Sequence, residues 1–193
     1  MGEVEGQIRT EELDAEREAR RRAALLLVRQ YPDPVLRMKA KEVDELDESV
    51  PELVERMTKL MDEAHGVGLA APQIGILRRV LVYRTGEDAA AVGLVNPRLT
   101  AKGEELEVAD EGCLSLGAAT VIVEVERPLS VTVEGLSPTG DTLRIEAEGL
   151  EARVLQHELD HLDGVLTIDR TTPEQRRAAL GQLRPQPVLG PIP

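Results

Sequence analysis

Residues 156–164 read QHELDHLDG and contain two of the three histidines of this 193-residue chain. Positions four apart in an α-helix lie about 40° apart around its axis, so His157 and His161 project from one face, a turn apart. The leucines and valine around them form two apolar arcs: Leu150 and Val154 beside the histidines, and Leu155, Leu159 and Leu162 roughly opposite. A helix that is apolar on two sides packs between layers. The first constraint on the fold is therefore a buried helix whose imidazoles need partners.

A shared metal ion would supply those partners. Two histidines four residues apart can bind one divalent ion, and a glutamate directly after the first can reach a water on that ion. Glu158 has that position, and such a glutamate takes and returns the proton of a water whose pKa the ion lowers. The competing interpretation is an ordinary charged helix. Random arrangements of this composition contain the pattern in roughly 0.4% of chains, which favours the metal site.

A catalytic ion of this kind needs a third protein ligand and an open fourth position. No histidine follows His161, which excludes a ligand set completed by a downstream histidine. The remaining candidates are Cys113, His65, Asp163 and Asp169. Cys113 lies in the segment DEGCLSLG, where a free cysteine could equally serve as a small apolar core residue. The residues alone leave the third ligand open.

Helices are predicted before and after a block of short strands. Apolar residues at helical spacing predict a helix over 51–64, and Thr172 and Gln175 have the capping-box spacing that opens another over 173–184. Between 79 and 148, short apolar–polar alternations predict β-strands. Strands grouped between helices favour an α+β fold. We expect short, mostly antiparallel sheets packed around the metal-binding helix, with an N-terminal and a C-terminal helix.

The chain divides into three regions. The sequence of residues 1–29 predicts a charged helical extension. The two prolines of YPDPVL end this helix. Residues 30–184 predict the catalytic domain, and the proline-rich residues 185–193 predict a disordered tail.

Charge and cysteine content narrow the partners and the compartment. A net charge of −13 argues against direct DNA binding, which needs clustered cations. A single cysteine indicates a reducing compartment. The first ten residues lack the apolar region of a secretory signal, and the longest apolar run, residues 23–28, is too short to span a bilayer. We therefore expect a cytoplasmic protein without membrane contact.

Three segments, GVGLAAPQ (66–73), EGCLS (111–115) and QHELDHLDG, occur in an order and spacing that resembles peptide deformylase. That family consists of metal-dependent hydrolases that remove the N-formyl group from formyl-methionyl nascent polypeptides. YPDPVLR near the start and GVLTIDR after the histidines are also similar to the family. The resemblance covers residues 28 to 175 and implies the same activity here.

The resemblance implies a metal centre with defined roles. Cys113, His157 and His161 would hold the ion, with water as the fourth ligand. That water would attack the formyl carbon, and Glu158 would be the general acid and base. The implied ion is Fe²⁺, for which Zn²⁺, Ni²⁺ or Co²⁺ can substitute. The implied partners are formyl-methionyl nascent peptides, with the ribosome as a further candidate partner.

The resemblance also implies how the substrate is held. The side-chain amide of Gln73 and the backbone N–H of Leu114 would bind the developing oxyanion. Gly68 would lend backbone hydrogen bonds to the peptide, which would lie like an added strand. Three aliphatic residues would wall the methionine pocket: Val67, Leu150 and Val154.

One segment departs from the family pattern. After EGCLS the family continues with an apolar residue, a proline and soon an arginine, whereas residues 116–120 read LGAAT and the next arginine is Arg127. The departure leaves the shape of the peptide groove, the rate and the substrate preference open. Two alternatives to a deformylase are a metallopeptidase of the H-E-x-x-H type and a catalytically weak relative that binds nascent chains. The cysteine-containing motif counts against the first, and the retained Glu158 and Gln73 count against the second.

Overall fold

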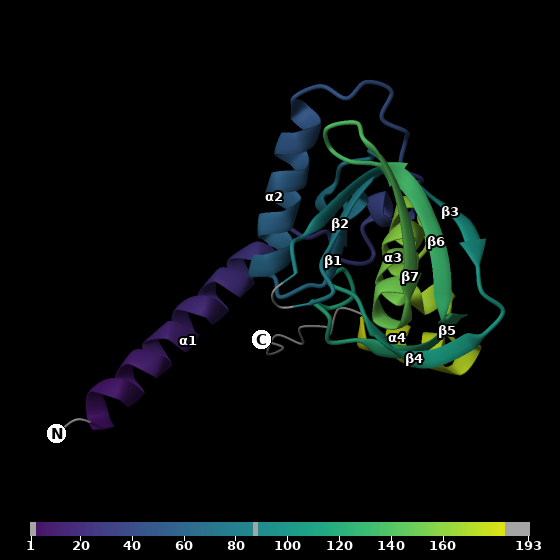
Figure 1. Ribbon diagram of the computed structural model, residues 1–193. Helices are drawn as coiled ribbons and strands as arrows, with labels where there is room; N and C mark the ends of the chain where they lie inside the picture. Colours follow the sequence, from purple (N-terminus) through teal and green to yellow (C-terminus); the bar gives the residue numbers. More distant parts are fainter. Residues whose placement is uncertain (1–2, 87–88, 184–193) are drawn as a thin grey trace, which may run out of the picture.

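The computed structural model describes residues 3–86 and 89–183, with side chains from residue 14 onward (Figure 1). The α-helices of this part are α1 (Glu3–Leu25), α2 (Ser49–Glu63), α3 (Gly149–Leu162) and α4 (Pro173–Gln182). The strands are β1 (Gly68–Ala70), β2 (Val80–Tyr83), β3 (Val92–Lys102), β4 (Leu106–Gly112), β5 (Ile122–Pro128), β6 (Ser130–Leu136) and β7 (Thr142–Glu148). Short 3-10 turns are η1 (Pro34–Arg37), η2 (Ala71–Ile74) and η3 (Thr167–Asp169).

The strands form two antiparallel sheets. The larger has the order β1-β2-β3-β6-β7, and the smaller consists of β4 and β5. Every strand pairing is antiparallel. This arrangement confirms the predicted α+β fold with short antiparallel sheets.

The larger sheet separates α2 from α3, and strand β2 shows why. Val80 and Val82 pack into the cluster around α2, whereas Leu81 and Tyr83 pack into the cluster around α3. Side chains alternate between the two faces of a strand, so β2 is apolar on both faces because a helix covers each. The result is a three-layer core.

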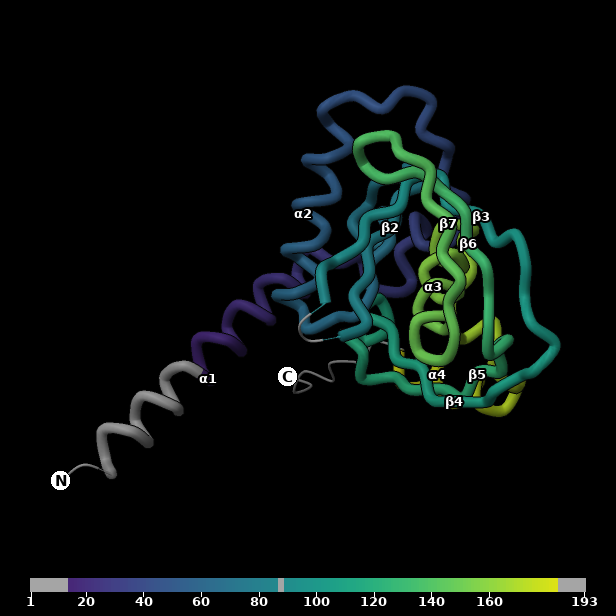
Figure 2. Tube along the Cα trace, viewed as in Figure 1, coloured from purple at the N-terminus to yellow at the C-terminus, as the bar shows by residue number. Residues whose placement is uncertain are grey.

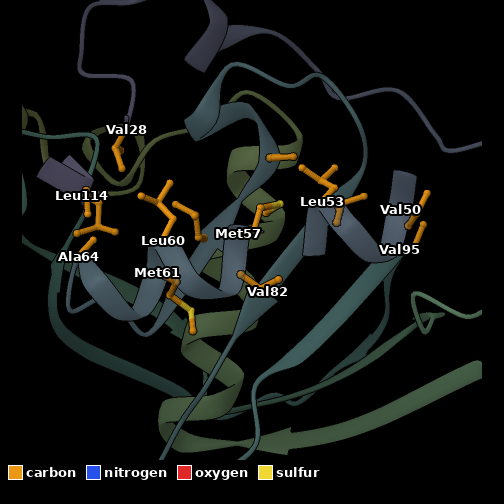
Figure 3. Packing of buried hydrophobic residues seen from close by; sticks show 14 residues of the cluster. Val28, Val50, Leu53, Met57, Leu60, Met61, Ala64, Val82, Val95 and Leu114 are labelled. Carbon is orange, nitrogen blue, oxygen red and sulfur yellow. The ribbon is translucent and has the colours of Figure 1, made fainter. Parts of the chain in front are cut away.

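Helix α2 covers one face with a continuous apolar stripe, shown in Figure 3. Its buried side chains are Val50, Leu53, Met57, Leu60 and Met61. The helix starts two residues before the predicted position. At its end, His65 takes a left-handed φ of 56°, and the Gly66 N–H donates to the Met61 carbonyl at 2.9 Å. This bonding pattern is a Schellman termination, in which glycine is the usual left-handed residue.

Helix α3 lies between the larger sheet and the small β4–β5 sheet. Its leucine arc packs with the larger sheet, as predicted, and most of its residues from Ala152 to Leu162 are buried. A third cluster joins β5 to α4 and η3 and includes the cysteine. The predicted central helix is therefore confirmed, with a sheet on either side.

From residue 14 to its end, helix α1 lies outside the body of the molecule, as Figures 1 and 2 show. Among its described side chains, residues 14–25, Ala24 near the C-terminal end is buried, and Val28 follows into the same cluster as α2. The exposed part carries ion pairs between residues four apart, such as Arg22 with Glu18 at 3.1 Å. The predicted N-terminal helix is present and ends at Leu25. The predicted tail, residues 185–193, lies outside the described residues.

The glycine-rich segment 66–75 contains two short elements, because Gly68–Ala70 pairs with β2 and Ala71–Ile74 forms a 3-10 turn. One local prediction needs correction. At α4, the Thr172 hydroxyl accepts from the Gln175 N–H at 3.3 Å as predicted. The Gln175 side chain instead accepts from the Glu124 N–H at 2.8 Å, so the capping box is half formed. None of the described helices is both long and apolar enough to cross a membrane.

Candidate metal centre

One thiol and two imidazoles meet between α3 and the end of β4. The Cys113 Sγ lies 3.2 Å from the His161 Nε2, which lies 3.2 Å from the His157 Nε2. The three ligand atoms all lie within 4.8 Å of one another. Cys113 is placed by the strand that ends at Gly112, and both histidines are placed by α3.

These spacings fit a single tetrahedral ion. Metal–nitrogen bonds of about 2.0–2.1 Å and a metal–sulfur bond of about 2.3 Å put neighbouring ligand atoms about 3.3–3.6 Å apart. The observed 3.2 Å separations need only small movements to reach those values. Both Cys113 and His161 are almost fully buried, which limits the access of water to their ligand atoms.

The other candidates for third ligand do not join the two imidazoles. His65 lines the same cavity as Cys113 but is exposed at the end of α2. Asp163 pairs with Arg79 at 2.8 Å, and Asp169 pairs with Arg176 at 2.6 Å. Among the described residues, Cys113 alone joins the two histidines in such a group.

Glu158 is buried beside the ligands with one oxygen unsatisfied. Its side chain is 4% exposed, and Oε2 has no hydrogen-bond partner among the described residues. Burial raises the pKa of Glu158 to about 7 because the charged form loses its hydration. The strand residue Gly68 lies against it, and a Cβ at that position would come within 2.3 Å of Oε1.

Gln73 is oriented with its amide nitrogen toward the centre. Its Oε1 accepts from the Ala70 N–H at 2.8 Å, which fixes the identity of the two ends of the amide. Its Nε2 lies 3.2 Å from the Ser115 Oγ and 3.8 Å from the Cys113 Sγ. The 3-10 turn η2 carries this side chain and is closed by Gly75 at a left-handed φ of 81°.

Leu114 follows the cysteine in a tight turn. The N–H groups of Leu116 and Ala119 both donate to the Cys113 carbonyl, at 2.9 and 3.0 Å. Among the described residues, none accepts a hydrogen bond from the Leu114 N–H. Leu114 and Gln73 line the same cavity, so the two predicted oxyanion donors are brought together.

The segment 116–120, whose sequence departs from the family pattern, follows an unusual backbone path. Gly117, Ala118 and Ala119 have φ values of 61°, 55° and 64°. Proline has φ fixed near −65°, so it could not occupy position 117 on this path. Ala119 lines the cavity, so this turn forms part of its wall.

The residues predicted to form the methionine pocket line the same cavity. Its volume is about 230 Å³, and Val67, Leu150 and Val154 all line it. Val154 is buried, whereas Val67 and Leu150 are more than half exposed. Val154 therefore lies inside the cavity, and the other two lie at its mouth.

Sequence reasoning missed a buried carboxylate, Glu111, which orients one histidine. Its Oε2 lies 3.1 Å from the His157 Nδ1. It also accepts from Arg127 at 2.6 and 2.9 Å, and from Arg153 at 2.8 Å. A carboxylate on Nδ1 fixes the tautomer in which Nε2 is free to bind a metal ion.

The charges around Glu111 hold it ionised. Burial alone would raise its pKa, but the hydrogen bonds from His157 and Arg127 outweigh burial and lower the pKa to about 2. Arg127 also donates to Asp160 at 2.9 Å, and Arg170 donates to the same carboxylate. Opposite charges therefore alternate through the interface between α3 and β5.

The pKa values of the two histidines are shifted in opposite directions. Burial disfavours the charged form of His157, but its hydrogen bonds with Cys113 and Glu111 outweigh burial and raise its pKa well above the usual value. Burial, reinforced by the charge of His157, lowers the pKa of His161 well below its usual value. Metal binding requires neutral imidazoles and a thiolate, so an ion would displace protons from this cluster.

A signal for these residues exists in the sequence but is weak. Arg127 continues the alternation of Val123 and Val125 on the buried face of β5, so a buried cation could be inferred there. Glu111 directly precedes the glycine that leads to the cysteine. No local pattern shows that these side chains meet α3.

Comparisons with known proteins agree with this geometry. A family model described as "Polypeptide deformylase" matches residues 25–177. The chain is 48% identical to a peptide deformylase of Natranaerobius thermophilus over 147 residues, which is 76% of this chain and 92% of that protein. It is 42% identical to a peptide deformylase of Thermodesulfovibrio yellowstonii over 156 residues, 79% of this chain and 93% of that protein.

Solved structures give the same result. The crystal structure of a peptide deformylase from Legionella pneumophila is similar with a TM-score of 0.76 and 38% identity, covering 81% of this chain and 91% of that one. The peptide deformylase of Thermotoga maritima is similar with a TM-score of 0.71 and 44% identity, covering 76% of this chain and 97% of that one.

Proposed function

The chain belongs to the peptide deformylase family, and from this we propose that Glu158 is the proton carrier of its metal centre. The activity is metal-dependent removal of the N-formyl group from nascent peptides. Family membership also argues against the alternative that the protein is a metallopeptidase. What remains to be assigned is the role of each side chain.

Cys113, His157 and His161 are the proposed ligands, supported by their spacing. A divalent ion held there would lower the pKa of a water toward neutrality and polarise it for attack. We propose Fe²⁺ as the resident ion because the family resemblance implies it. Zn²⁺, Ni²⁺ or Co²⁺ can substitute, since a thiolate with two imidazoles suits all four ions.

Glu158 has the position and the pKa that proton transfer requires. Glu158 lines the cavity together with Cys113 and His157, and its Oε2 has no hydrogen-bond partner among the described residues, so this oxygen can accept the proton of the attacking water. A pKa of about 7 lies close to the working pH, which is the favourable range for a group that both takes and gives a proton. The proton then goes to the departing amine, and formate leaves.

The formyl oxygen gains negative charge as the carbon becomes tetrahedral. We assign its two donors to the Nε2 of Gln73 and the N–H of Leu114. Gln73 is supported by its anchored Oε1, which leaves Nε2 to donate, and Leu114 is supported by its unbonded N–H. Removing one such donor typically slows a reaction by about 10²–10³-fold.

The peptide is proposed to bind along β1. This strand is at the end of the larger sheet, so one of its edges has no strand partner within that sheet. A peptide can add to such an edge through backbone hydrogen bonds, and Gly68 is the residue of β1 beside Glu158. The methionine side chain would then enter the aliphatic cavity between Val67, Leu150 and Val154.

The observation that carries this assignment is the convergence of Cys113, His157 and His161 beside the unsatisfied Glu158. The test is formate release from formyl-Met-Ala-Ser by protein purified anaerobically and supplied with ferrous iron. Glu158→Ala should abolish release while the metal content is retained. Peptide-bond cleavage, or peptide binding without formate release, would contradict the assignment and favour one of the two alternatives.

Three further expectations stay predictions. The ribosome is a candidate partner by family resemblance, and the C-terminal residues 185–193 lie outside the described residues. A cytoplasmic location rests on composition. The division into an extension (1–29) and a catalytic domain (30–184) can be tested by deleting the extension and measuring activity.

A further inference from the structure

The residues that follow the N-terminal helix contact the backbone of both proposed oxyanion donors. The Arg29 N–H donates to the Gln73 carbonyl at 2.7 Å. The Gln30 Nε2 donates to the Leu114 carbonyl at 2.8 Å, and the Tyr31 N–H donates to the Ser115 carbonyl at 2.9 Å. We call residues 29–31 the brace.

Gln30 uses both ends of its amide. Its Nε2 also lies 3.3 Å from the Val28 carbonyl, and its Oε1 accepts from the Ala118 N–H at 3.1 Å. One side chain therefore ties Leu114 to the left-handed turn that contains Ala118. Left-handed alanines are strained, so this turn keeps its shape only if surrounding contacts hold it.

The carbonyl and the N–H of Leu114 belong to peptide planes that are joined at its Cα. The side chain of Leu114 is buried in the cluster around α2, which limits rotation on one side. The hydrogen bond from Gln30 limits rotation of the carbonyl plane on the other. Together these contacts hold a residue that lines the cavity and whose N–H has no acceptor among the described residues.

From these contacts we propose that Gln30 is a positioning residue: seated in the brace, its carboxamide holds Leu114 in the orientation that binds the formyl oxygen. This inference rests on the proposed role of Leu114. The inference also links the segment after the N-terminal helix to the reaction. Helix α1 ends five residues before Gln30, and Val28, which lies between them, is buried in the cluster around α2.

Gln30→Ala removes the side-chain bonds and leaves the backbone bonds of Arg29 and Tyr31 in place. Gln30→Glu keeps an acceptor for Ala118 but loses the donor to Leu114. The matched control is Gln182→Ala, since Gln182 is exposed on α4. Each variant is loaded with ferrous iron, and kcat and KM for formyl-Met-Ala-Ser are measured with metal content and thermal midpoint.

A misplaced donor weakens binding of the transition state more than binding of the substrate. Gln30→Ala should therefore lower kcat roughly 10- to 100-fold with KM within about twofold of wild type. Metal content should be unchanged, and Gln30→Glu should fall between wild type and alanine. Amide hydrogen exchange in the segment 114–119 should accelerate in Gln30→Ala, with or without metal.

A Gln30→Ala enzyme with wild-type kcat would overturn the proposal. So would a loss of activity that follows loss of metal or of folding in both Gln30 variants, because that pattern indicates a merely structural role. If the wild-type protein releases no formate, the proposed function fails. Hydrogen exchange in the 114–119 segment then still decides whether Gln30 holds Leu114.

Discussion

Gly68→Ala is the substitution whose effect the structure defines most sharply. A Cβ at this position would lie 2.3 Å from the Oε1, 2.7 Å from the Cδ and 2.9 Å from the Cγ of Glu158. The φ of Gly68 is not in the left-handed region, so alanine fits the backbone itself. The overlap must be relieved by the carboxyl group of Glu158, which has to move by about 1 Å to reach normal contact distances.

A displacement of about 1 Å can slow a reaction about 100-fold, which corresponds to about 2.7 kcal/mol in the activation free energy. We therefore expect kcat for formate release from formyl-Met-Ala-Ser to fall about 100-fold. Metal content should be retained because the three atoms nearest to the new methyl group all belong to Glu158, which is not a proposed ligand. Zinc or iron content, measured on the same samples, checks this.

The matched control is Gly181→Ala, because a Cβ there meets nothing within 4 Å. It should leave kcat unchanged and stabilise α4 by about 0.5–1 kcal/mol. A Gly68→Ala enzyme with kcat within about twofold of wild type would refute the packing argument. A rise in KM at constant kcat would also refute it, since the methyl group would then obstruct the peptide and not Glu158.

Three further predictions concern metal affinity, helix termination and pH. Glu111→Gln should weaken zinc binding about 10- to 100-fold in chelator competition, because His157 loses its charged acceptor; unchanged affinity would contradict the orienting role. His65→Gly should raise the free energy of unfolding in urea by about 1 kcal/mol by removing the left-handed strain, and no gain would show that the imidazole itself contributes. In the metal-free protein, folded Glu158 keeps its proton up to about pH 7, whereas the unfolded chain releases it near 4.5. Wild type should therefore lose about 3 kcal/mol of stability relative to Glu158→Gln between pH 4 and pH 8, and a pH-independent difference would contradict the raised pKa.

Periodicity predicted the helices and their burial well. The apolar arcs of residues 150–162 placed α3 between two layers, because burial on two sides of a helix leaves a direct mark on its sequence. The paired histidines and Glu158 could be found for the same reason, since their spacing is local. The glycine-rich segment 66–75 was harder to predict. Its short strand exists because β2 pairs with it, and such pairing leaves no local pattern.

The rest of the site depends on contacts between distant parts of the chain. The choice of Cys113 over His65 or the two aspartates could not be made from the residues alone, because it depends on where β4 ends relative to α3. Glu111 and Arg127 were missed because the alternation in β5 marks Arg127 as buried but does not show which residue it pairs with. The family resemblance identified the ligands, and the geometry explains why those residues serve.

The central claim is that one thiolate and two imidazoles bind a single divalent ion. Zinc-edge X-ray absorption of the zinc-loaded protein measures this directly. The zinc ion should have two nitrogen neighbours at about 2.0–2.1 Å and one sulfur neighbour at about 2.3 Å, and the sulfur should be lost in Cys113→Ser. A first shell without sulfur in the wild-type protein, or one that Cys113→Ser leaves unchanged, would contradict it.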